Sequence, residues 1–249
     1  MAEYDNRVRS MNATATGAIA IDEGLRAYML RVYNYMLMGL VLSGLTAWVV
    51  ATVPQVQALF FQFNPAAGRV GLAPLGWVAL LAPLGLVFFL GWRIQQMSLQ
   101  AAQTTFWVFS GLMGVSLAPV LLVYTGASIA QTFFVTASMF GAMSLWGYTT
   151  KRDLTGMGSF LMMGLFGIII AMVVNWFVHS GTVALVISIL GVIIFTGLTA
   201  YDTQKIKESY YVSDDGQLMG KKAVMGALNL YLDFINLFMF LLRFMGDRR

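Results

Sequence analysis

Seven long apolar runs constrain the fold of this 249-residue chain more than any other feature. They cover about residues 28–53, 72–92, 104–124, 129–148, 157–178, 182–202 and 223–244. A helix rises about 1.5 Å per residue, so each run can cross the roughly 30 Å hydrocarbon core of a bilayer. Helices satisfy every backbone hydrogen bond within one continuous apolar run. We therefore predict an all-α integral membrane protein with seven transmembrane helices.

The composition supports this prediction and excludes several other classes. Hydrophobic residues make up 59% of the chain and charged residues only 10%. In a soluble domain, about a quarter of the residues are charged. The sequence contains no cysteine, which excludes disulfides and thiol chemistry. The net charge is +4. In a membrane protein, such an excess mainly reflects Lys and Arg in loops that face the cytoplasm, so we expect no nucleic-acid partner.

Basic residues of the short loops predict the orientation, because Lys and Arg favour the cytoplasmic side. A cytoplasmic N-terminus places these residues inside: Arg7, Arg9, Arg26, Arg93, Lys151, Arg152, Lys205, Lys207, Lys221 and Lys222. Only Arg69 then lies in the predicted outer loops. We predict a cytoplasmic tail over residues 1–27, a seven-helix domain over 28–249, and a multi-pass location in the cell inner membrane. The basic C-terminus opposes this bias, but the length of the seventh run favours a complete crossing.

The seventh run carries an acidic residue, Asp233, in its middle. Asn229 and Asn236 share one helical face with it, through i, i+4, i+7 spacing. A carboxylate is costly in lipid, so this face should meet protein or water. A purely structural role also remains open, in which a neutral Asp233 is hydrogen-bonded to a neighbouring side chain.

A second acidic residue, Asp202, ends the sixth run, and Thr199 lies one turn earlier on the same face. If the sixth and seventh helices are neighbours, Asp202 and Asp233 could share a proton and act as a pH sensor. When both are ionised, they suit a hard cation such as Ca²⁺, held transiently as in a pore. An ordinary ion pair between Asp202 and Lys205 is the alternative. We expect no tightly bound cofactor, with Ca²⁺ as the transported ion and lipid and protons as partners.

Two segments carry a family resemblance. Thr199–Lys207 (TAYDTQKIK), followed about twenty residues later by Ala227–Arg243 (ALNLYLDFINLFMFLLR), closely resembles the paired C-terminal signatures of the Bax inhibitor-1 (transmembrane Bax inhibitor motif) family, bacterial branch. Ser110–Pro119 (SGLMGVSLAP) is also similar to the third span of that family. The resemblance covers nearly the whole chain except the N-terminal tail.

The resemblance implies six helices surrounding a central seventh, with Asp202 and Asp233 as a di-aspartyl pH sensor. It also implies a pH-dependent Ca²⁺ leak across the membrane. An arginine at the inner end of the second span would latch onto Asp202 in the closed state, and Arg93 matches this position best. Arg93 could equally be a positive-inside anchor. The sequence departs from the bacterial pattern at 94–96, where Ile-Gln-Gln replaces a basic run.

Three other functions share some of these features. Intramembrane aspartyl proteases also use two membrane aspartates, but they carry Gly-x-Gly before the second one. Here Leu230, Tyr231 and Leu232 precede Asp233, so we expect no enzyme. A Ca²⁺/H⁺ antiporter would use the same residues. A non-transporting regulator would instead bind a membrane protease or a death-pathway protein, with the N-terminal tail as the natural contact.

Overall fold

The computed structural model describes the backbone of residues 2–64 and 69–249, and the side chains of residues 23–62 and 71–249. The bounds of the long helices are α1 Ala2–Thr52, α3 Pro74–Arg93, α4 Leu99–Val123, α5 Gly126–Thr149, α6 Thr155–Val178, α7 Gly181–Glu208 and α8 Gly216–Met245. Within the described ranges, seven helices are long and apolar enough to cross a membrane. The prediction of an all-α membrane protein with seven spans is confirmed.

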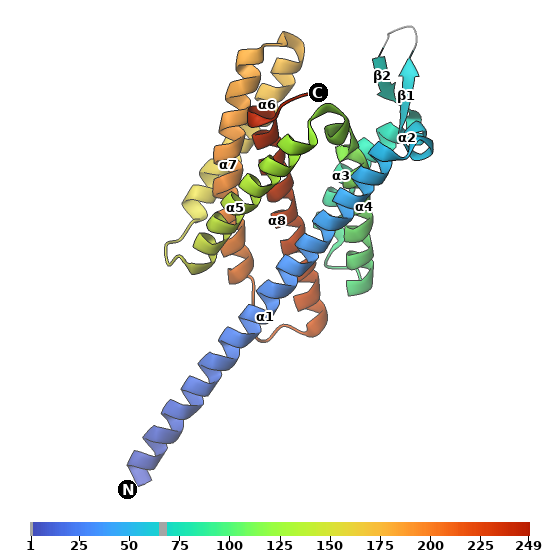
Figure 1. Cartoon of the computed structure of the whole chain (residues 1–249). Helices are drawn as coiled ribbons and strands as arrows, with labels where there is room; N and C mark the ends of the chain where they lie inside the picture. The colour runs from blue at the N-terminus through green and yellow to red at the C-terminus, as the bar shows by residue number, and fades with distance from the viewer. Residues whose placement is uncertain (1, 65–68) are drawn as a thin grey trace.

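Three segments differ from the sequence-based expectation. Residues 54–71, expected to be a loop, form a short helix, α2 (Pro54–Phe60), and an antiparallel hairpin of β1 (Phe61–Asn64) and β2 (Arg69–Leu72). Proline at the first helical position explains why α2 begins at Pro54. The backbone of α1 continues back to Ala2, so most of the predicted tail extends the first helix beyond the bundle (Figure 1).

The charged loop expected over 203–222 is much shorter, because α7 continues to Glu208 and α8 begins at Gly216. Lys205 and Lys207 lie in the last turn of α7, where cations complement the helix dipole. Asp215 caps α8 by accepting a hydrogen bond from the Leu218 amide at 2.6 Å. Hydropathy alone misses these two extensions, because their turns are polar.

Successive helices run in opposite directions between two ends of the bundle (Figure 1). We call the end with the α7–α8 connection the loop end, and the opposite one the C-terminal end. At the C-terminal end, the amide of Thr125 donates to the Asp247 carbonyl at 3.1 Å, and that of Arg249 donates to the Val123 carbonyl at 2.9 Å. The last residues therefore dock on the α4–α5 turn, and the unbroken α8 connects the two ends.

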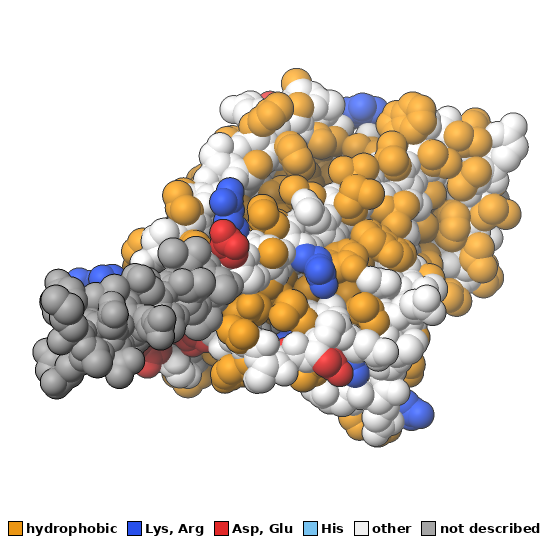
Figure 2. Space-filling model, turned by 90° about the horizontal axis from the view of Figure 1, so that it is seen from below, with side chains coloured by type: hydrophobic (Ala, Val, Ile, Leu, Met, Phe, Trp, Pro, Cys, Tyr) orange, Lys and Arg blue, Asp and Glu red, His pale blue; other side chains and the backbone are white. Residues whose placement is uncertain are grey.

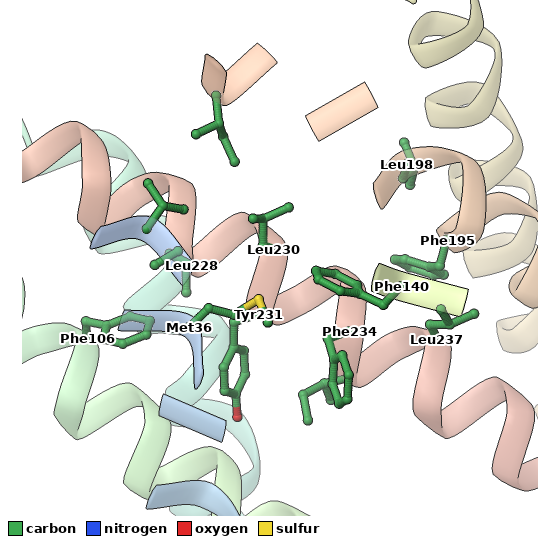
Figure 3. Close-up of a cluster of buried hydrophobic side chains, with 14 of the residues drawn as sticks. Met36, Phe106, Phe140, Phe195, Leu198, Leu228, Leu230, Tyr231, Phe234 and Leu237 are labelled. Atoms are coloured by element: carbon green, nitrogen blue, oxygen red, sulfur yellow. The ribbon is translucent and has the colours of Figure 1, made fainter. Parts of the chain in front are cut away.

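α8 is the innermost of the spanning helices. In its most apolar stretch 67% of the residues are buried, against 17% for α6. It packs against α1, α4, α5 and α7, whereas α6 packs chiefly against α7. Side chains from several helices converge on α8 in Figure 3. The predicted ring of six helices around the seventh is not confirmed, since α6 lies mainly behind α7.

Small residues let several helices approach closely. A Cβ atom at Gly114 of α4 would lie 2.4 Å from the Ser43 carbonyl oxygen of α1. A similar approach joins α5 to α7, where a Cβ at Gly147 would lie 2.2 Å from the Ala200 carbonyl oxygen. By contrast, Gly111 faces open space. The second of these contacts brings the polar residues of α5 and α7 within reach of one another.

Candidate functional site

The two predicted aspartates meet where α7 packs against α8. Their carboxyl groups lie close enough to interact electrostatically. Asp233 is 4% exposed, while Asp202 is only partly covered. Two carboxylates offer acceptors only, so a hydrogen bond between them requires a proton on one of the pair.

Among the described side chains, no basic group pairs with Asp233. Its Oδ2 atom is buried and unpartnered in the described part of the chain. The only ion pair among the described side chains joins Lys222 to Asp214, away from this site. Lys205 acts electrostatically on Asp202, but its ammonium is exposed and lies 5.7 Å from the centre of the Tyr201 ring. Within 23–62 and 71–249, no cluster of three or more acidic, histidine or cysteine residues forms a metal site.

A chain of hydroxyl groups lies beside the pair, and most of it was not anticipated from the sequence. The Thr203 hydroxyl donates to the Thr199 carbonyl at 2.7 Å and lies 2.9 Å from Ser144 Oγ of α5. Ser144 in turn bonds the Tyr33 hydroxyl of α1. Of these residues only Thr199, which is fully buried, was a predicted site residue. The others come together through contacts between distant helices, for which the sequence gives no local indication beyond the four-residue spacing of Ser128, Thr132 and Thr136 earlier in α5.

The two predicted asparagines have different surroundings. Asn236 donates to the carbonyl of Leu232 in its own helix at 2.8 Å, so its amide is used locally. Asn229, one turn before Asp233, lines a cavity of about 210 Å³ near the loop end. Lys205, Lys221 and Lys222 also line this cavity. Figure 2, which views the molecule from below, shows Lys and Arg side chains scattered among apolar ones.

Arg93, the predicted latch, is the last residue of α3 and is exposed. It forms no ion pair in the described ranges, so the Arg93–Asp202 latch is not formed in this conformation. The next two residues, Ile94 and Gln95, line the cavity near Asn229. Lys221 of α8 donates to the Gln95 carbonyl at 3.1 Å, which fastens the end of α3 beside the cavity.

The remaining polar residues of the TAYDTQKIK segment hold the α5–α6 turn. Gln204 accepts a hydrogen bond from the Leu154 amide and donates one to the Arg152 carbonyl, both at 2.8 Å. Lys207 donates to the Tyr148 carbonyl at 2.7 Å. These residues fix α7 against its neighbours around Asp202, so we interpret them as positioning residues.

Comparisons with known proteins agree with the motifs. The family model described as "Inhibitor of apoptosis-promoting Bax1" matches residues 25–249. Inner membrane protein YbhL of Escherichia coli (strain K12) is 46% identical over 228 residues, which cover 91% of this chain and 94% of that protein. An uncharacterized protein of Rickettsia prowazekii (strain Madrid E) is 48% identical over 228 residues, covering 92% of each chain. An uncharacterized membrane protein of Streptococcus pyogenes is 35% identical over 225 residues, covering 90% of this chain and 94% of its own.

Proposed function

Because the chain belongs to the family of inhibitors of apoptosis-promoting Bax1 and is a multi-pass membrane protein, we propose that it is a pH-sensitive Ca²⁺ leak channel of the inner membrane. Its gate in this proposal is the Asp202–Asp233 pair. One observation carries the argument: the buried Asp233 carboxyl group, whose Oδ2 atom has no hydrogen-bond partner among the described residues, lies beside the Asp202 carboxyl group inside a membrane-spanning bundle.

The chemistry of the pair supports pH sensitivity. Two neighbouring carboxylates repel each other, and neither aspartate forms an ion pair within the described part of the chain. The pair therefore keeps a proton that each residue alone would release more readily. Loss of that proton leaves two negative charges, which would draw a divalent cation toward oxygen ligands. In this proposal Ca²⁺ is the cargo, and the protein is neither an enzyme nor the holder of a cofactor.

The cavity near the loop end supports an entry route. It reaches Asn229, one helical turn from Asp233. Lys205 and Lys221 at its wall would repel a cation, as expected of a closed state. The end of α3 also borders the cavity, so a shift of α3 would change its width. We propose that Arg93 approaches Asp202 only in another conformation, and that the loop end faces the cytoplasm.

The test is Ca²⁺ entry into proteoliposomes from about pH 6 to about pH 8, where a shared carboxyl proton would titrate. The wild type should leak with a clear pH dependence. Asp233→Asn and Asp202→Asn should each flatten that dependence, because a single carboxyl group cannot share a proton. Glu208→Gln is the matched control, since Glu208 is an exposed carboxylate at the end of the same helix as Asp202.

Other outcomes would favour other functions. Absence of Ca²⁺ entry at every pH would contradict the leak and direct attention to a membrane-protein partner. Movement of Ca²⁺ against its own gradient, driven by an imposed pH gradient, would indicate a Ca²⁺/H⁺ antiporter. An unchanged pH dependence in both aspartate variants would remove the pair from the gate.

A further inference from the structure

The buried seam of α5 has an unusual composition for a membrane helix. Its fully buried residues are Ser128, Thr132, Thr136, Phe140, Ser144 and Gly147. The first five follow one another at four-residue spacing, so they form one row that winds gradually around the helix. Four of the five are hydroxyl residues, and the fifth is a phenylalanine.

This row connects the aspartate pair to the C-terminal end of the bundle. At one extreme, Ser144 Oγ lies 2.9 Å from the Thr203 hydroxyl, and Thr203 directly follows Asp202. At the other, Ser128 Oγ accepts a hydrogen bond from the Asp247 amide at 2.7 Å. α5 packs against both α7 and α8, so the row follows the seam between these helices.

Thr132 gives an independent indication that the row meets a polar ligand. Its side chain is 1% exposed, and its Oγ1 has no hydrogen-bond partner among the residues that the structure describes. In the described part of the chain, the only other buried side-chain atom without a partner is Asp233 Oδ2. Close helix packing explains small residues, but alanine would serve it without an unsatisfied hydroxyl. Water or a passing cation would give both atoms a partner.

Phe140 is the one apolar member of the row. Its ring centre lies 5.5 Å from that of Phe234, which directly follows Asp233. Figure 3 shows Phe140 among Phe195, Phe234 and Leu237 beside α8. Along α5, Phe140 stands between Ser144, which reaches Thr203 beside Asp202, and the hydroxyl residues Thr136 and Thr132. A short apolar constriction of this kind closes an aqueous path by excluding water.

We infer that the α5 row is the C-terminal half of the cation path, lined by Ser128, Thr132 and Thr136 and plugged at Phe140. This inference rests on the proposed function and adds the lining and the plug, which neither the motifs nor the aspartate pair specify. The path would then run from the cavity at Asn229, past the two aspartates and Phe140, to the C-terminal end.

The absence of cysteine from the sequence permits a direct test of the lining. Ser128→Cys, Thr132→Cys and Thr136→Cys are made singly, and the protein in lipid nanodiscs is treated with a cationic, membrane-impermeant methanethiosulfonate reagent. Each should react about tenfold faster than Phe134→Cys, because a thiol facing lipid forms no thiolate. Phe134 lies on the same helix and is 70% exposed on the outer surface of the bundle. Equal rates at all four positions would overturn the lining.

The plug is tested by Ca²⁺ entry into proteoliposomes at the pH where the wild type leaks least. Phe140→Ala should raise the entry rate about tenfold, and Phe140→Leu, which keeps apolar bulk, should stay near the wild-type rate. Phe134→Ala is the control, since it removes the same ring from the lipid-facing side. A rate unchanged by Phe140→Ala, in protein that retains its thermal stability, would show that Phe140 is only a packing residue.

The two readouts separate this inference from the proposed function, because labelling requires no Ca²⁺ transport. Ca²⁺ entry in the wild type together with unreactive row cysteines would overturn the inference and leave the leak standing. Reactive row cysteines without Ca²⁺ entry in any variant would overturn the Ca²⁺ leak and keep an aqueous path along α5.

Discussion

At the scale of single residues, one buried polar contact fastens α1 to α8. Ser43 Oγ lies 2.7 Å from the Tyr231 hydroxyl and donates to the Ser110 carbonyl of α4 at 2.6 Å. The Tyr231 ring packs edge-on against Phe109, with centres 5.2 Å apart. Ser43→Ala should lower the free energy of unfolding by about 1–3 kcal/mol, because it leaves the buried Tyr231 hydroxyl without a partner.

Tyr231→Phe removes both the hydroxyl and the need to satisfy it, so it should cost about 1 kcal/mol. The Ser43→Ala/Tyr231→Phe double variant should be more stable than the sum of the single effects predicts. Chemical denaturation in detergent, followed by tryptophan fluorescence, measures all three variants. Strict additivity would indicate that the two hydroxyls do not interact.

At the scale of elements, two glycines of α4 provide a matched pair. A Cβ at Gly114 would meet the backbone of α1, whereas nothing lies within 4 Å of one at Gly111. Gly114→Ala should therefore lower the apparent melting temperature by about 5 °C, because α1 must move away from α4. Gly111→Ala should leave it unchanged or slightly higher, since alanine favours a helix. Thermal unfolding in detergent decides the matter, and an equal effect of both substitutions would refute the packing argument.

The elements also show where sequence-based prediction succeeds and where it stops. Hydropathy locates all seven spans, because lipid demands long apolar helices. It ends α7 too early and begins α8 too late, because the last turn of α7 and the first turns of α8 are polar. The proximity of Asp202 and Asp233 could be anticipated, because the two residues lie on consecutive helices that were expected to be neighbours. The Tyr33–Ser144–Thr203 chain could not, since it joins three helices through tertiary packing alone.

At the scale of the whole molecule, a complete crossing of α8 would place the basic C-terminus against the positive-inside bias, and this C-terminus docks on the α4–α5 turn. Arg248 lies 5.8 Å from the centre of the Tyr124 ring, and the Arg249 amide donates to the Val123 carbonyl. The charged tail is thus held on the α4–α5 turn. The positive-inside bias is a statistical preference. The length of α8, by contrast, is a physical measure: its 30 unbroken residues span about 45 Å, which is enough to cross the bilayer.

We therefore expect the loop end and the C-terminus to lie on opposite sides of the membrane. Lys151→Cys and Ser213→Cys place single thiols at exposed sites of the α5–α6 and α7–α8 connections, and Arg249→Cys places one at the exposed C-terminus. With the loop end in the cytoplasm, an impermeant maleimide should label the first two only in inverted vesicles and the third only in intact cells. Labelling of all three from one side would mean that α8 re-enters and does not cross. The reverse pattern would keep the crossing and invert the proposed orientation, and with it the side from which Ca²⁺ reaches the aspartate pair.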